Sequence, residues 1–139
     1  MAASTSFRIS ETARRRLAAR ADWEGMTVTA LLDRLIMEGC DQVDFPAIVF
    51  RGPVNDRRAA LAAGPDVWEI VSRLQELSGS EEQRIATLAE ESDLHPRLIR
   101  IALDYGAEHR PAIQARIDHN RAIAEHQAQV VHERRQLLA

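Results

Sequence analysis

The chain has 139 residues, which is room for one domain or for two small ones. Hydrophobic residues make up 45% of it but aromatic residues only 4%, so any core must consist mainly of leucine, isoleucine, valine and alanine. No apolar run approaches the ~20 residues of a membrane-spanning helix, no signal-peptide segment opens the chain, and the single cysteine, Cys40, allows no internal disulfide. We therefore expect a cytoplasmic protein with no membrane partner.

The net charge of −3 conceals an uneven distribution of charge along the chain. All 18 basic residues are arginine, which a GC-rich genome would by itself explain. Residues 1–20 hold five arginines and one acid, for a net charge of +4, whereas residues 21–139 hold 13 arginines and 20 acids, for a net charge of −7. This asymmetry predicts that only the N-terminal segment meets a polyanion.

The N-terminal segment predicts a short strand followed by a helix. Residues 4–9 alternate polar and apolar side chains, which is the pattern of a half-buried strand. Ser10 is a suitable N-cap for a helix over 12–24, and Gly25 is a suitable residue to end it. Thr27 can then cap a second helix.

That second helix, expected over 28–41, completes a first unit of residues 1–43, which the polar, proline-containing segment 42–46 closes. A unit of this size is too small to bury a core as a monomer, and a lone strand is unstable. Antiparallel pairing of the strands of two chains would solve both problems and would leave a two-stranded ribbon, whose polar face fits the major groove of DNA. The expected dimerisation residues are Phe7, Ile9, Leu31 and Leu35.

Residues 4–42 resemble the ribbon-helix-helix repressors, through the alternating strand, the passage "RISE" into the first helix, and "GMTVTALLDRLI". In that family the polar face of the strand reads bases and the first amides of the second helix bind a phosphate. The residues thereby assigned to DNA contact are Ser4, Ser6, Arg8, Arg14, Arg15, Thr27 and Val28. The serine side chains are short and discriminate weakly between bases, so Arg8 should supply most of the sequence specificity by binding the edge of a guanine. The alternative is an edge strand of a larger sheet, with Arg8 merely exposed.

Residues 46–110 form a second predicted unit. Segments 47–51 and 57–62 flank a Gly-Pro-Val-Asn-Asp turn and predict a β-hairpin. Helices are expected over 66–77, 81–92 and 96–109. The last two have the lengths and spacing of a helix-turn-helix, although their periodicity is equally that of a plain helical hairpin.

The second unit resembles a winged helix-turn-helix family, domain of unknown function 433, over about residues 46–120. The resemblance rests on the hairpin, on the helix start with Pro65, Val67 and Trp68, and on the segment "IRIALDY". Members of that family are commonly antitoxins of the VapB type, encoded beside a PIN-like ribonuclease toxin. The hairpin turn departs from the usual form, and the expected recognition helix has little net positive charge. Contact with DNA, dimerisation and docking of a partner therefore stay open for this unit.

Residues 111–139 predict a long amphipathic helix, which suits a groove on a partner protein. If that partner is a PIN-like ribonuclease, its carboxylate cluster holds Mg²⁺, and an inserted arginine would pair with the carboxylates and exclude the metal. The candidate toxin-binding residues are Arg121, Val131, Arg134 and Arg135. The alternative is a helix that packs on its own domain or frays.

Sequence features of an enzyme are missing. His119, His126 and His132 do not share a helix face, so a metal site is not expected. Cys40 lies where the second helix ends and is better explained as a small core residue than as a nucleophile. The chain has no glycine-rich phosphate loop and no nucleophile elbow. We expect neither a catalytic residue nor a cofactor.

Together these patterns predict a mostly α-helical protein: a ribbon-helix-helix unit that dimerises, a small winged helix-turn-helix-like unit with a β-hairpin, and a long C-terminal helix. The leading hypothesis is the antitoxin of a type II toxin–antitoxin module, which binds its own operator as a homodimer or higher oligomer and neutralises a PIN-like ribonuclease toxin. The alternative is a stand-alone repressor whose second domain binds a ligand or another protein. An assembly or partition protein is a third, less favoured class.

Overall fold

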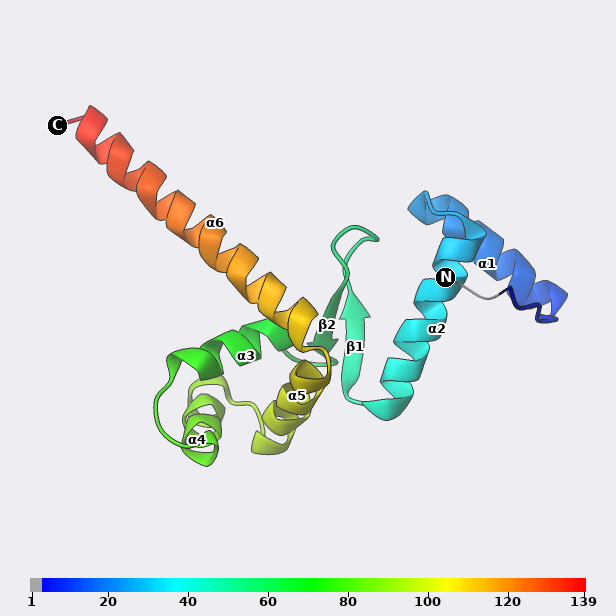
Figure 1. Cartoon of the computed structure of the whole chain (residues 1–139), viewed down its shortest axis with the longest axis horizontal. Helices are drawn as coiled ribbons and strands as arrows, with labels where there is room; N and C mark the ends of the chain where they lie inside the picture. Colours follow the sequence, from blue (N-terminus) through cyan, green and yellow to red (C-terminus); the bar gives the residue numbers. More distant parts are fainter. Residues whose placement is uncertain (1–3) are drawn as a thin grey trace.

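The structure is a computed structural model, which describes residues 4–139. The first three residues of the predicted N-terminal unit lie outside that range. In chain order the elements are α1 (Glu11–Glu24), α2 (Val28–Asp44), β1 (Ile48–Arg51), β2 (Arg58–Leu61), α3 (Val67–Glu76), α4 (Glu81–Ser92), α5 (Pro96–Glu108) and α6 (Arg110–Leu137) (Figure 1). The expectation of a mostly helical chain with one antiparallel hairpin and a long C-terminal helix is confirmed.

The helix starts follow from side chains that cap the first turn. The Ser10 hydroxyl accepts a hydrogen bond from the backbone N–H of Ala13 at 3.1 Å, and Thr27 caps α2 through the N–H of Ala30 in the same way. Gly25 ends α1 in the left-handed conformation, with φ 67°, which glycine adopts without a steric cost. These local interactions explain why the helix starts were predictable.

A single large core holds the second unit together. The hairpin pairs Ile48 with Leu61 and Arg51 with Arg58, and α3 packs against β2, α5 and α6. The fully buried side chains of this core are aliphatic, as the composition requires; the largest are Ile48, Leu61, Val67, Ile85 and Ile99.

The core of α1 and α2 is much smaller. It consists of Leu17, Ala21 and Leu31, with Met26 packed against them. Residues 4–10 carry no regular secondary structure in the single chain, so the predicted strand stays a prediction that concerns the dimer. This part of the molecule leaves most of its apolar side chains uncovered.

Side-chain contacts connect α2 to the second unit across the predicted boundary at residues 42–46. Helix α2 continues three residues past its predicted end, to Asp44, and Phe45 packs edge-to-face against Tyr105 of α5 with ring centroids 5.4 Å apart. Arg57, at the end of the hairpin turn, makes a bidentate ion pair with Glu38 of α2. These long-range contacts extend α2 and join it to the second unit.

The C-terminal helix, predicted over residues 111–139, has two parts that differ in packing. The first two turns of α6 belong to the second unit, because Ile117 is fully buried and Arg116 forms an ion pair with Asp56 of the hairpin turn. Beyond Asn120 nearly all of α6 is exposed, and the helix extends away from the rest of the chain (Figure 1). The projecting segment therefore comprises residues 121–139.

Candidate nucleic-acid and dimer interface

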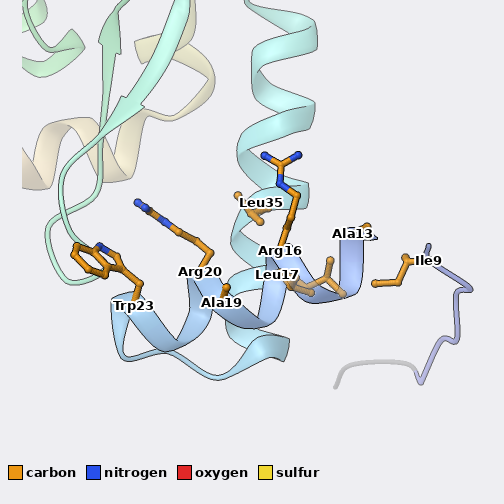
Figure 2. Close-up of a pocket in the computed structure, with 9 residues that line it drawn as sticks. Ile9, Ala13, Arg16, Leu17, Ala19, Arg20, Trp23 and Leu35 are labelled. Atoms are coloured by element: carbon orange, nitrogen blue, oxygen red, sulfur yellow. The ribbon is translucent and has the colours of Figure 1, made fainter. Parts of the chain in front are cut away.

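An apolar groove lies between α1 and α2. Its volume is about 710 Å³, and Figure 2 shows Ile9 at one end, Trp23 at the other, and the Arg16 and Arg20 side chains between them. The apolar lining residues are Ile9, Ala13, Leu17, Ala19, Trp23, Leu32 and Leu35. The indole of Trp23 is 81% exposed, so one wall of the groove consists of a large side chain that the single chain leaves in water.

The apolar stripe of α2 continues the same uncovered surface. Leu32, Leu35, Ile36 and Val43 recur at helical spacing and are all exposed; they are 38%, 45%, 50% and 78% accessible. Cys40 borders this stripe and is exposed, so the expectation of a core cysteine is wrong for the single chain. An apolar face of this extent is typical of a protein–protein contact.

The four predicted dimerisation residues behave differently. Phe7 and Ile9 are exposed, as is Leu35. Leu31, by contrast, is fully buried against Leu17 and Ala21 of its own chain. Leu31 therefore belongs to the small core of the single chain, and a second copy is not needed to cover it.

The predicted base readers lie in the N-terminal arm, residues 4–10. Ser4, Ser6 and Arg8 are exposed, and none of them makes a side-chain hydrogen bond or ion pair with any of residues 4–139. Arg14 is different, because its guanidinium binds Glu11 one turn earlier in α1, with Nε 3.0 Å from a carboxylate oxygen. The hydrogen bonds between these two side chains lower the pKa of the Glu11 carboxyl and raise the pKa of the Arg14 guanidinium. Arg15, which is exposed and has no ion pair in the described chain, is the more available phosphate contact.

The start of α2 presents free backbone N–H groups to solvent. Thr27 uses its hydroxyl to cap Ala30, which leaves the amides of Val28 and Thr29 without an acceptor among residues 4–139. All of these residues are exposed. The geometry is that of a helix N-terminus that can accept a phosphate.

The second unit offers less to DNA. Asp93, in the left-handed conformation with φ 58°, forms the turn between α4 and α5, and α5 packs against both α3 and α4. On the exposed face of α5, Arg100 is paired with Glu82, while Arg97 lies on the same helix as Asp104 and Glu108. This helix therefore presents a surface of mixed charge rather than a basic one.

The four candidate toxin-binding residues lie on the projecting part of α6, where Val131 is 42% exposed. Arg121, at its base, donates to the side chain of Gln75 on α3 at 3.1 Å. Arg134 and Arg135, in the last turn, form no ion pair with any of residues 4–139. The two distal arginines are thus the ones free to meet carboxylates of a partner.

Sequence reasoning missed a set of ion pairs between segments far apart in the chain. Glu24 binds Arg34 of α2 in addition to Arg20 of its own helix, and the pair with Arg34 joins α1 to α2. Asp56 of the hairpin turn binds Arg58 and Arg116, 60 residues later. Only their residue types were visible beforehand, because nothing in a helical or strand periodicity specifies a partner at such a separation.

Among residues 4–139 there is no group of three or more histidine, cysteine or acidic side chains that could hold a metal ion. Within the same range, each helix is too short or too polar to cross a bilayer.

Comparison with protein-family models, with curated proteins and with solved structures finds no match to this chain.

Proposed function

We propose that the chain is a homodimeric DNA-binding repressor and the antitoxin of a toxin–antitoxin module. The observation that carries the DNA-binding half is the uncovered apolar surface of the arm, α1 and α2, directly beside the most basic segment of the chain. Its residues are Phe7, Ile9, Trp23, Leu32, Leu35, Ile36 and Val43.

A second copy of the chain is the occupant that accounts for this surface. Phe7 and Ile9 alternate with Ser6 and Arg8, so pairing of two arms as an antiparallel ribbon buries the apolar residues and exposes the polar ones. Each large apolar side chain that becomes buried contributes about 1.5–3 kcal/mol. The three-residue core of α1 and α2 makes such a gain necessary for a stable N-terminal unit.

The proposed dimer would read DNA through the exposed polar face of the ribbon. Arg8 would reach a guanine edge, and the free amides at the start of α2 would hold the flanking phosphates. Arg15 would add a contact to the DNA backbone that is independent of sequence. The second unit would contribute little, because the arginines of α5 lie among acids.

The antitoxin half of the proposal depends on the projecting part of α6. A helix that extends from its domain with exposed Ile123, Val130 and Val131 suits a groove on a partner protein. Arg134 and Arg135 at its end would pair with the metal-binding carboxylates of a PIN-like ribonuclease and displace the cation.

The DNA-binding half is tested with the DNA upstream of the chain's own reading frame and a scrambled control duplex. In fluorescence anisotropy, Arg8→Gln should lower the preference for the cognate duplex about tenfold, since a bidentate guanine contact is worth about 1–3 kcal/mol. Arg97→Gln on α5 is the matched control and should leave the preference unchanged. Unchanged selectivity in Arg8→Gln, or a loss confined to Arg97→Gln, would show that the ribbon is not the reader.

The antitoxin half is tested by co-expression with a nuclease encoded in the adjacent reading frame. The full chain should restore growth, whereas a chain that ends at Asn120, which keeps the buried Ile117, should not. The shortened chain should still bind the upstream DNA, which separates loss of the partner contact from loss of folding. Rescue of growth by the shortened chain would rule out the projecting helix as the inhibitor.

A further inference from the structure

A second cavity, of about 700 Å³, lies where α2, the hairpin, α5 and α6 meet. In Figure 1 the hairpin stands between α2 and the base of α6, and residues of all three elements line this space. Its volume is in the range of pockets for small molecules. Neither dimerisation nor docking of a partner on the far end of α6 uses it.

Aromatic side chains form much of the cavity wall. The Tyr105 ring stacks on His109 with centroids 4.1 Å apart and meets the Phe50 ring edge-to-face at 6.4 Å. Burial and the nearby Asp41 carboxylate raise the pKa of Tyr105 to about 12, so its hydroxyl stays neutral at physiological pH. Trp68 lines the cavity as well, and its indole N–H donates to Asp66 at 3.2 Å. These faces suit a flat, apolar molecule.

Two of the four arginines that line the cavity are already committed to structural partners. Arg57 donates to Glu38 and to the carbonyl oxygen of Gly52. Arg34 donates to Glu24 through both of its terminal nitrogens. These two side chains fix α2 to α1 and to the hairpin. The Nε of Arg34 is buried without a hydrogen-bond partner in the described chain, but both of its terminal nitrogens are occupied by Glu24.

The other two arginines have unused donors. Arg116 of α6 and Arg58 of β2 share one carboxylate, Asp56, and the pKa of that carboxyl is lowered mainly by its hydrogen bond with Arg116. Arg58 also binds Asp66, whereas Asp56 is the one acceptor of Arg116 among residues 4–139. The Nε of Arg116 is buried and has no hydrogen-bond partner there, and its guanidinium lies 6.0 Å from the centre of the Trp68 ring.

The cavity and the proposed dimer surface lie on opposite faces of α2. Arg34, Met37 and Glu38 line the cavity, whereas Leu32, Leu35 and Ile36 belong to the exposed stripe, and the centres of the two sets lie about 160° apart around the helix axis. A second copy bound to the stripe would therefore leave the cavity open. Asp33, a lining carboxylate without an ion pair in the described chain, is on α2, so the anion-binding residues are the arginines of β2 and α6, Arg58 and Arg116.

We propose that this cavity binds a small aromatic carboxylate. The ring of the ligand lies between Trp68 and the Tyr105–His109 stack, and its carboxylate accepts hydrogen bonds from the unused N–H groups of Arg116 and Arg58. The inference does not depend on the antitoxin proposal, because it needs only the second unit and α2.

The test uses 1-naphthoate and benzoate as probes and 1-naphthamide as the uncharged match. The indole N–H resonance of Trp68 is followed by NMR, and Trp23→Phe assigns it, because the chain has two tryptophans. We expect a saturable shift of that resonance with naphthoate and at least tenfold weaker binding of naphthamide. Arg116→Gln should weaken the binding of naphthoate at least tenfold. Arg121→Gln, on the same helix but outside the cavity, should leave that affinity unchanged.

Arg116 also anchors α6, so Ala112→Phe provides a second variant that keeps every ion pair. Ala112 lines the cavity from an exposed position on α6, and a phenyl group there should fill the space and abolish binding in a folded protein. Absence of a saturable shift with either acid would overturn the proposal. So would equal affinity for naphthamide, or full binding by Ala112→Phe.

Discussion

Glu24, at the last position of α1, shows how a single side chain joins two helices. Its carboxylate accepts from Arg34 of α2 at 2.9 Å and from Arg20 of α1 at 2.8 Å. The hydrogen bonds from Arg34 are the largest cause of a pKa near 2 for this carboxyl, against an ordinary value of 4.5. The charged form is therefore stabilised by folding, and this matters in a unit whose apolar core contains only three buried residues.

Glu24→Gln should lower the stability of the N-terminal unit at neutral pH. Because the folded-state pKa of Glu24 is depressed, its contribution is complete above about pH 4.5 and is lost as the pH falls towards 2. The difference in urea midpoint between wild type and Glu24→Gln should therefore shrink over that window. Glu11→Gln, which removes an exposed pair in the same helix, is the control and should have a smaller effect. A difference that does not vary with pH would contradict this assignment.

Leu31 and Leu35 show what periodicity leaves undetermined. The two residues lie one turn apart on the same apolar side of α2, and the sequence alone assigned both to a dimer contact. In the structure α1 covers Leu31 completely and leaves Leu35 45% exposed. Which of two equivalent positions lies under a neighbouring helix depends on how the helices cross, and periodicity does not encode that angle.

At the scale of elements, local chemistry made most helices predictable. The Ser80 hydroxyl and the Gln83 side chain form the expected capping box of α4, and Pro96 occupies the first turn of α5. The predicted end of α2 was three residues too early. The helix continues because Phe45 packs on Tyr105 and Glu38 binds Arg57. Those partners are far along the chain, so tertiary packing overrode the polar sequence that predicted a break.

Helix α6 has two energetically distinct parts, and Ile117 and Ile123 report on them. Ile117 is fully buried against the second unit, whereas Ile123 is 42% exposed on the projecting part. Ile117→Ala should reduce the free energy of unfolding by about 2–5 kcal/mol, and Ile123→Ala should change it by less than about 1 kcal/mol. Chemical denaturation followed by the fluorescence of Trp68 in a Trp23→Phe background measures both. Equal losses in the two variants would show that the distal helix packs on its own domain.

The whole molecule combines one core that is complete and another that is not. The second unit buries ten apolar or aromatic side chains in one cluster, whereas α1 and α2 bury three. The sequence indicated this imbalance through the small size of the first unit, but the joints between the units were invisible to it. Two ion pairs, Glu38–Arg57 and Asp56–Arg116, hold α2 and α6 to the same hairpin turn. The helix that ends the first unit and the C-terminal helix are therefore linked through one short segment.

The proposed dimer has a consequence that each of the two tryptophans can report separately. Wild-type protein should have a mass of about twice 15.6 kDa by light scattering, and Leu35→Glu, which places a charge in the apolar stripe, should be monomeric. In a Trp68→Phe background, the fluorescence of Trp23 reports the unfolding of α1 and α2. In a Trp23→Phe background, the fluorescence of Trp68 reports the unfolding of the second unit.

Leu35→Glu should therefore lower the melting temperature measured by Trp23 fluorescence far more than the one measured by Trp68 fluorescence. The reason is that only the N-terminal unit needs a second copy to complete its core. Asp104→Glu, an exposed change on α5, is the matched control and should alter neither mass nor melting. A wild-type mass of one chain, or a Trp23 transition that does not depend on protein concentration, would mean that the apolar stripe is not the surface on which two copies meet.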